Sequence, residues 1–237
     1  MSGLYINNGA EGTAYGYTGL FGRVRGTIGE DAAAVKNLAI AGADIAGFNS
    51  VGSMAGYLDF CAMENCIVTD ANIAGKDAVG GVAGYAMNGT FAQNRCVGVT
   101  VSGSERVGGI AGSIDASTVN TSYATGAVSG SAFVGGIVGS MFNYSIENCY
   151  AANAVSGSTY VGGIAGSATG PASDKVQNCA ALNPSVKATA TAVWAGRVIG
   201  NLSASLAGNT AFGGMVGQPV CGRGARRLVL RGCGVHL

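Results

Sequence analysis

Charged, aromatic and proline residues are all scarce in this chain. Of its 237 residues, 11% are charged, 7% are aromatic and 3 are proline. The shortage of proline excludes a collagen-like protein, because collagen needs proline-rich triplets with glycine at every third position, and glycine does not recur in that way here. Histidine occurs once, at His236, so the repeat region offers no histidine for a zinc site or a catalytic triad.

The motifs of the common catalytic and cofactor sites are missing too. The sequence contains no CxxC pair, no HExxH and no GxxxxGK[ST] phosphate-binding loop. It also lacks the GGxGxD repeat of calcium-binding solenoids. We therefore expect no metal, no cofactor and no catalytic residue in this chain.

Charge and hydropathy disfavour two kinds of partner. Residues 1–217 carry 9 Lys and Arg against 12 Asp and Glu, so the repeat region has no excess of positive charge to attract nucleic acid. No apolar run is long enough to span a membrane. The opening residues, "MSGLYINNGAEG", lack a basic stretch followed by an apolar core, and we expect no signal peptide in this chain.

Glycine and small hydrophobic residues are what the chain has in abundance. It contains 42 glycines, and 48% of its residues are hydrophobic. A disordered linker would lack that hydrophobic content, which is enough to bury a core. The composition therefore indicates an ordered structure that needs glycine at fixed positions.

A glycine-rich motif recurs at a nearly constant interval. "VGSMAG" at Val51 is followed by "VGGVAG", "VGGIAG", "VGGIVG" and "VGGIAG", which begin at Val79, Val107, Val134 and Val161. Looser copies begin at Tyr17, Ala195 and Phe212. A period of about 27–28 residues is typical of a repeat architecture.

Asparagine marks a second position in each repeat. One asparagine lies about half a repeat before each regular motif, and another lies slightly further before the copy at Ala195; they are Asn37, Asn65, Asn94, Asn120, Asn148 and Asn178. Short stretches of alternating residues follow, as in "NCYAANAVSG", and this period of two predicts strands. We expect glycine or asparagine to occupy the turns that need a positive φ.

The repeat therefore predicts an all-β fold, a parallel β-solenoid with about 27–28 residues per coil. Coils stacked about 4.8 Å apart would place like residues in columns. Val, Ile and Ala would then fill a narrow core, and the asparagines would form a hydrogen-bonded ladder. Cys66, Cys149 and Cys179 would share one column, either as buried thiols or, for the last two, as a disulfide between neighbouring coils.

The same residues carry a resemblance to a known repeat. Gly19, Leu20, Phe21 and Gly22 match the Gly-Leu-any-Gly pattern of the GLUG motif, and the "VGGIAG" copies resemble it more loosely. The resemblance covers roughly residues 17–217. It implies a bacterial cell-surface or secreted protein, since GLUG repeats occur in adhesin-like proteins and in some immunoglobulin A peptidases, where they are not catalytic.

These observations divide the chain into three parts. Residues 1–16 form an N-terminal flank or incomplete cap, 17–217 the GLUG-like solenoid, and 218–237 a basic tail outside the repeat. The tail contains four arginines and no acid. It is either a basic cap or linker, or an artefact of truncation or reading frame.

Parallel β-solenoids also include polysaccharide lyases and hydrolases, so paired acids need attention. Asp59 and Asp115 each lie eight residues after a motif valine, which predicts one column with two coils between them. Glu64 and Glu147 are predicted to be three coils apart. Glycoside hydrolysis needs two carboxylates about 5–10 Å apart, but the sequence predicts no lysine, arginine or histidine beside Asp59 and Asp115. We therefore interpret these acids as solvated surface residues and not as a catalytic pair.

The sequence therefore favours a non-catalytic structural or adhesive segment over its alternative, a carbohydrate-active β-helix enzyme. The expected partners are host glycans, surface proteins or neighbouring domains of a longer chain. Four tyrosines are candidates for one sugar-stacking side, or are ordinary strand residues. They are Tyr123, Tyr144, Tyr150 and Tyr160.

Overall fold

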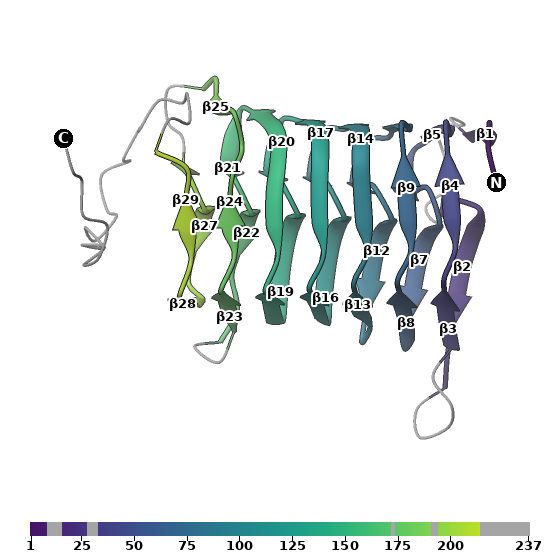
Figure 1. The fold of residues 1–237 in the computed structure, drawn as a ribbon, viewed down its shortest axis with the longest axis horizontal. Helices are drawn as coiled ribbons and strands as arrows, with labels where there is room; N and C mark the ends of the chain where they lie inside the picture. The colour runs from purple at the N-terminus through teal and green to yellow at the C-terminus, as the bar shows by residue number, and fades with distance from the viewer. Residues whose placement is uncertain (9–15, 28–32, 172–173, 191–193, 214–237) are drawn as a thin grey trace.

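The computed structural model describes residues 1–8, 16–27, 33–171, 174–190 and 194–213. Over these residues the chain contains strands and no helix. Its strands stack in parallel into a β-solenoid (Figure 1). The smallest sheet, which takes one strand from each coil, has six strands, so the solenoid has about six coils. The predicted fold class is therefore confirmed.

Three parallel sheets, A, B and C, form the walls of the solenoid. Sheet A has eleven strands: β1 (Tyr5–Asn8), β4 (Ala39–Ala41), β5 (Asp44–Gly47), β9 (Ile67–Thr69), β10 (Asn72–Ala74), β14 (Arg95–Ser102), β17 (Tyr123–Ser129), β20 (Tyr150–Gly157), β24 (Ala180–Ala181), β25 (Val186–Ala188) and β29 (Thr210–Ala211). Sheet B has six: β6 (Asn49–Gly52), β11 (Asp77–Gly80), β15 (Glu105–Gly108), β18 (Ala132–Gly135), β21 (Thr159–Gly162) and β26 (Ala195–Gly196).

Sheet C has twelve strands. They are β2 (Phe21–Arg25), β3 (Ala33–Lys36), β7 (Ala55–Asp59), β8 (Cys61–Glu64), β12 (Ala83–Met87), β13 (Thr90–Ala92), β16 (Ala111–Asn120), β19 (Val138–Glu147), β22 (Ala165–Ala168), β23 (Lys175–Gln177), β27 (Ile199–Leu202) and β28 (Ser205–Ala207). Each coil thus passes through sheet B, then C, then A.

The motif valines stack in register along sheet B. Val51 pairs with Val79, and the column continues through Val107, Val134 and Val161 to Ala195. Two of the looser copies align differently from the prediction. At the N-terminal copy it is Thr18, one residue after Tyr17, that pairs with Val51. Phe212 follows β29 of sheet A and donates its backbone N–H to Ala181, so it does not occupy the sheet B position.

Most of the bends in each coil are marked by a positive φ. Between sheets C and A, one column of bends contains Asn37, Asn65, Gln93, Thr121, Asn148 and Asn178. A second column, within sheet C, contains Phe60, Asn88, Ala116 and Asn143. A third, in sheet B, contains Ser50, Ala78, Arg106, Phe133 and Tyr160, and a fourth, in sheet A, begins with Gly42, Asp70 and Gly98. The prediction that glycine or asparagine would occupy these turns is therefore only partly correct. Phenylalanine, tyrosine, arginine and alanine also adopt this strained conformation.

The motif glycines are required by close packing and not by φ. None of the "VGG" glycines has a positive φ. A Cβ added at Gly108 would overlap the carbonyl oxygen of Ala111 and lie 2.7 Å from the backbone nitrogen of Gly139. The chain turns sharply between sheets B and C, so that backbone atoms of the following strand and of the next coil lie where a side chain would be. Only glycine leaves that space free.

The interior is narrow and is filled largely by stacked Val, Ile and Ala side chains, as predicted, to which Met, Leu and Cys side chains are added. Phe91 is the largest fully buried side chain, and no fully buried tyrosine or tryptophan appears among the described residues. The scarcity of aromatic residues follows from this geometry, because stacked coils leave little interior width.

Strand pairing extends into the residues expected to form the N-terminal flank. β1 pairs with β5 from Tyr5 to Asn8, within residues 1–16. The basic tail, 218–237, lies outside the described residues, and so does His236.

Candidate functional site

The acidic pair Asp59 and Asp115 occupies one column of sheet C, as predicted, with Met87 between them. The expectation that no basic residue would lie nearby is wrong. Arg25 Nε lies 3.3 Å from Asp59 Oδ2, and Arg23 Nη2 lies 3.8 Å from the same oxygen. The Asp59 side chain is 9% exposed, so it is also not the solvated acid that was expected.

The Arg23 and Arg25 contacts come from β2, which pairs with β7 so that Arg25 is opposite Asp59. Asp115 is engaged separately, because the Asn143 amide donates a hydrogen bond to its Oδ1 at 3.3 Å. Each acid therefore has its own polar partner. Met87 separates them and presents no proton-transfer group between the two carboxylates.

The glutamates Glu64 and Glu147 are three coils apart, as predicted, and each is the last residue of its sheet C strand. Ala92 and Asn120 lie between them in the column. Glu64 forms an ion pair with Lys36 at 2.9 Å. The two glutamates are therefore not brought together as a pair.

The asparagine ladder exists, but its alignment differs from the prediction. Asn65 donates to Asn37 Oδ1 at 2.8 Å, and Asn148 donates to Asn120 Oδ1 at 3.0 Å. Asn94 and Asn120 do not share the corner column, which holds Gln93 and Thr121 instead. Asn94 is fully buried one position later, where it accepts a hydrogen bond from the backbone N–H of Cys66.

The cysteines Cys149 and Cys179 lie on neighbouring coils and are both buried free thiols, which confirms the first of the two alternatives. Cys66 belongs to the same column further along the solenoid, as predicted. A hydrogen bond with Cys179, together with burial, raises the pKa of the Cys149 thiol. Burial raises the pKa of Cys61 to about 11. Cys149 and Cys61 are therefore mostly protonated at neutral pH and are poor nucleophiles.

A first groove runs along the corner between sheets B and C. It encloses about 320 Å³ and is lined by Tyr17, Asn49, Ser50, Tyr57, Asp77, Tyr85 and Met87. The Tyr57 ring stacks on Tyr85, with centroids 5.4 Å apart, and contacts the Tyr17 ring, which is tilted by 36° at a centroid distance of 4.9 Å. Partial burial raises the pKa of Tyr57 and of Tyr85.

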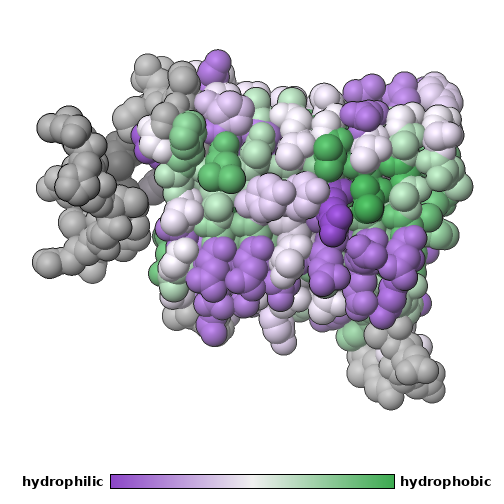
Figure 2. Space-filling model, in the orientation of Figure 1, coloured by the Kyte–Doolittle hydropathy of each residue, from purple (hydrophilic) through white to green (hydrophobic). Residues whose placement is uncertain are grey.

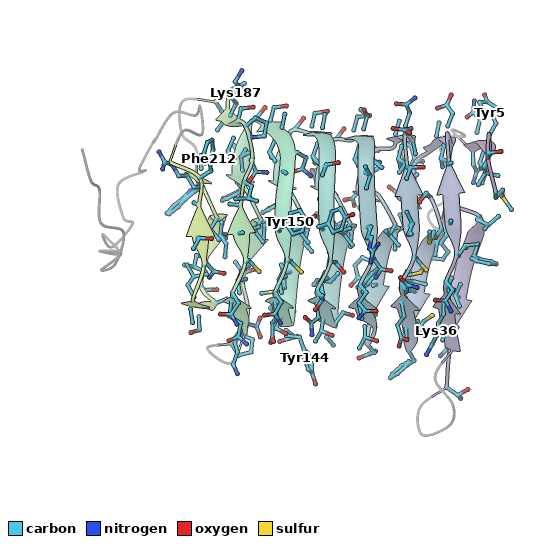
Figure 3. The ribbon with its side chains drawn as sticks, viewed as in Figure 1. Tyr5, Lys36, Tyr144, Tyr150, Lys187 and Phe212 are labelled. Carbon is cyan, nitrogen blue, oxygen red and sulfur yellow. The ribbon has the colours of Figure 1, made fainter. Side chains whose placement is uncertain are left out.

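A second groove lies on the outer face of sheet A, the face turned toward the viewer in Figures 2 and 3. It encloses about 300 Å³ and is lined by Gln93, Arg95, Thr121, Ser122, Tyr123, Asn148 and Tyr150. We call it the ladder groove, because most of its lining comes from the corner column and from one column of sheet A. Figure 3 shows Tyr150 near the middle of this face.

One of the two interpretations of the four candidate tyrosines required them to line one side of the molecule. They do not. Tyr123 and Tyr150 stack with centroids 4.6 Å apart on sheet A. Tyr160 stacks on Phe133 at 4.8 Å in sheet B, and Tyr144 lies on β19 of sheet C. A signal for the ladder groove was nevertheless present in the sequence, since Arg95, Tyr123 and Tyr150 follow one another at intervals of one repeat.

Two further features were sought in the part of the chain that the structure describes, a metal site and a membrane-spanning helix. No three His, Cys, Asp or Glu side chains within it gather closely enough to hold a metal ion. These residues also form no helix that is long and apolar enough to cross a membrane.

Comparison with known proteins supports the repeat and the fold. The GLUG motif matches residues 131–156, so the chain carries this motif in the coil from β18 to β20. A crystal structure of a Bacteroides ovatus protein, provisionally named an immunoglobulin A1 protease, has a TM-score of 0.57 and 19% sequence identity to this chain. The similarity covers 89% of this chain and 66% of that one, and at this identity it shows the fold alone. No curated protein matches the sequence.

Proposed function

We propose that this chain is a non-catalytic structural and adhesive segment of a bacterial cell-surface or secreted protein. Its solenoid would space neighbouring domains of a longer chain and present a surface that binds host glycans or surface proteins. The observation that carries the proposal is the arrangement of the acids. Asp59 is committed to Arg23 and Arg25, while Asp115 accepts a hydrogen bond from Asn143 on another coil.

This arrangement argues against acid–base hydrolysis of a glycan. A general acid must reach the leaving-group oxygen and give it a proton, whereas the Asp59 carboxylate is ion-paired with two arginines. Asp59 is also buried, so a substrate would have to displace the arginines to reach it. These ion pairs instead hold β2 against β7.

The surface setting is supported by the GLUG motif at residues 131–156 together with the solenoid. A solenoid built from stacked coils grows in length without growing in width, which suits a spacer. The outer faces of its sheets remain available for binding, because the core is formed entirely by inward-facing side chains.

The experiment that tests the proposal is a turnover assay on neutral and uronate-containing polysaccharides. Release of reducing ends or unsaturated uronates is measured for the wild type and for Asp115→Asn. We expect no product above the no-protein control from either form. Turnover that disappears in Asp115→Asn would instead establish the alternative, a polysaccharide lyase or hydrolase of the β-helix type.

A further inference from the structure

The ladder groove has features of a binding site that the proposed function does not specify. It runs along the solenoid axis across three coils, from Gln93 and Arg95 through Thr121 and Tyr123 to Asn148 and Tyr150. Ser122, buried between the corner column and sheet A, also lines it. The groove is therefore a shallow, elongated channel on an exposed face.

One aromatic ring in the groove has an uncovered face. Tyr123 and Tyr150 stack nearly parallel, at 8°, which covers one face of each ring. The next residue in the column after Tyr150 is Ala180, whose methyl group is too short to cover the other face. Tyr150 is accordingly 38% exposed. This differs from Tyr57 in the first groove, which has an aromatic neighbour on both sides.

Polar donors and acceptors flank this ring along the corner column. Gln93, Thr121 and Asn148 are exposed there, and the Asn148 amide is held by its hydrogen bond to Asn120. Arg95 is exposed and has no acidic side chain within ion-pair distance among the described residues. Its guanidinium can therefore donate hydrogen bonds to a ligand.

An aromatic face bordered by amides, a hydroxyl and a guanidinium matches the chemistry of a sugar. The C–H face of a pyranose is apolar and packs on an aromatic ring, while its hydroxyls pair with amide and guanidinium groups. Neighbouring coils are about 4.8 Å apart, close to the length of one residue in an extended glycan. The repeat of the groove thus matches the repeat of such a chain.

From these contacts we infer that the ladder groove binds an extended oligosaccharide, aligned with the solenoid axis, with one pyranose stacked on the open face of Tyr150. Arg95 and Asn148 hydrogen-bond the hydroxyls or a carboxylate of the adjacent residues. This inference rests on the proposed adhesive function, for which it names the ligand class and the site.

The test is titration calorimetry with defined hexasaccharides of four kinds: β-1,4-glucan, β-1,3-glucan, β-1,4-mannan and polygalacturonate. We expect at least one to bind, and the polygalacturonate arm distinguishes a carboxylate ligand from a neutral one. Tyr150→Ala should weaken that binding about tenfold or more, since it removes the stacking surface. Tyr150→Phe should bind as the wild type does.

Two further variants separate binding from folding. Arg95→Ala removes an exposed side chain, and it should weaken binding while leaving the thermal midpoint unchanged. Tyr144→Ala is the matched control, an exposed tyrosine on sheet C that should leave binding unaffected. No binding of any hexasaccharide would overturn the inference. Binding that Tyr150→Ala and Arg95→Ala both leave unchanged would overturn it as well. The proposed function fails separately, by turnover in the polysaccharide assay.

Discussion

At the scale of single residues, the chain is constrained most strongly at its glycines. The "VGG" glycines occupy ordinary regions of φ, yet their neighbours leave no space for a Cβ. Gly75, Gly103, Gly130 and Gly157 are constrained in another way. They face the motif valines, so that a Cβ at Gly75 would lie 2.8 Å from methyl groups of Val51 and Val79. The high glycine content therefore reflects contacts between strands more than flexible turns.

Replacing one motif glycine should strongly destabilise the fold. In Gly108→Ala the new methyl group would overlap the backbone of Ala111, which cannot move aside as a flexible side chain would. We expect the free energy of unfolding, measured in urea, to fall by about 3 kcal/mol, at the upper end of overpacking effects. Gly213→Ala is the matched control, because a Cβ there meets nothing within 4 Å. Equal losses in the two variants would contradict this explanation.

At the scale of elements, each coil is a set of short strands joined at strained bends. Exposed asparagines support the two ends of one column of bends, where Asn65 donates a hydrogen bond to Asn37 and Asn178 donates one to Asn148 on the preceding coil. Asn65 combines both features, with a φ of 49° and a hydrogen bond of 2.8 Å to Asn37. Asparagine suits such a position because it tolerates the left-handed region.

Two substitutions at Asn65 should separate the backbone contribution from the side-chain contribution. Asn65→Ala keeps a β-carbon in the left-handed region but loses the polar side chain that makes this conformation tolerable for asparagine, which costs about 1–2 kcal/mol, whereas glycine adopts it without that cost. We expect the free energy of unfolding to fall by that amount in Asn65→Ala and by less than half of it in Asn65→Gly. If both variants lost the same stability, the hydrogen bond to Asn37 would be the dominant contribution.

At the scale of the whole molecule, the solenoid behaves as a stack in which each coil contacts only its neighbours. Removing residues 107–133 should delete one coil, since Val107 and Val134 are paired between neighbouring coils. The shortened chain should keep its β-sheet circular dichroism and unfold cooperatively at a lower midpoint. Its denaturant m-value should fall by about one sixth, in proportion to the surface lost on unfolding.

The control for that deletion removes residues 107–120, about half of a coil. This change joins sheet B directly to the corner column and shifts every later strand out of register. We expect loss of cooperative unfolding, because a register shift exposes the buried face of each strand. A half-coil deletion as stable as the full-coil deletion would refute the stacked-coil description.

The accuracy of prediction from the sequence varied along the chain. The columns of Val51, Val79, Val107, Val134 and Val161 were predicted because the motif is local and nearly regular. The asparagine column was misaligned by one position at Asn94 and Asn120, where glutamine and threonine occupy the corner. The spacing alone could not decide between adjacent positions, since the inward or outward direction of each side chain depends on strand register.

Neighbours across an irregular coil were harder to predict. Arg25 lies opposite Asp59, although the step between them in the sequence is longer than the regular repeat. Asp59 therefore looked solvated in the sequence and is ion-paired in the structure. Tyr123 and Tyr150 were recognised as surface aromatics, but their stacking and the open face of Tyr150 follow from the residue that comes next in the column.

The sequence by itself determined that this protein is a parallel β-solenoid with a narrow core of small residues. Repeated residues at a fixed interval can bury their apolar side chains together only if successive coils stack. The tertiary structure decided which outward-facing side chains became neighbours. It paired Asp59 with two arginines and set Tyr150 beside Ala180 in the ladder groove. These outcomes depend on the register of strands across insertions of unequal length, and that register is set by packing of the whole stack.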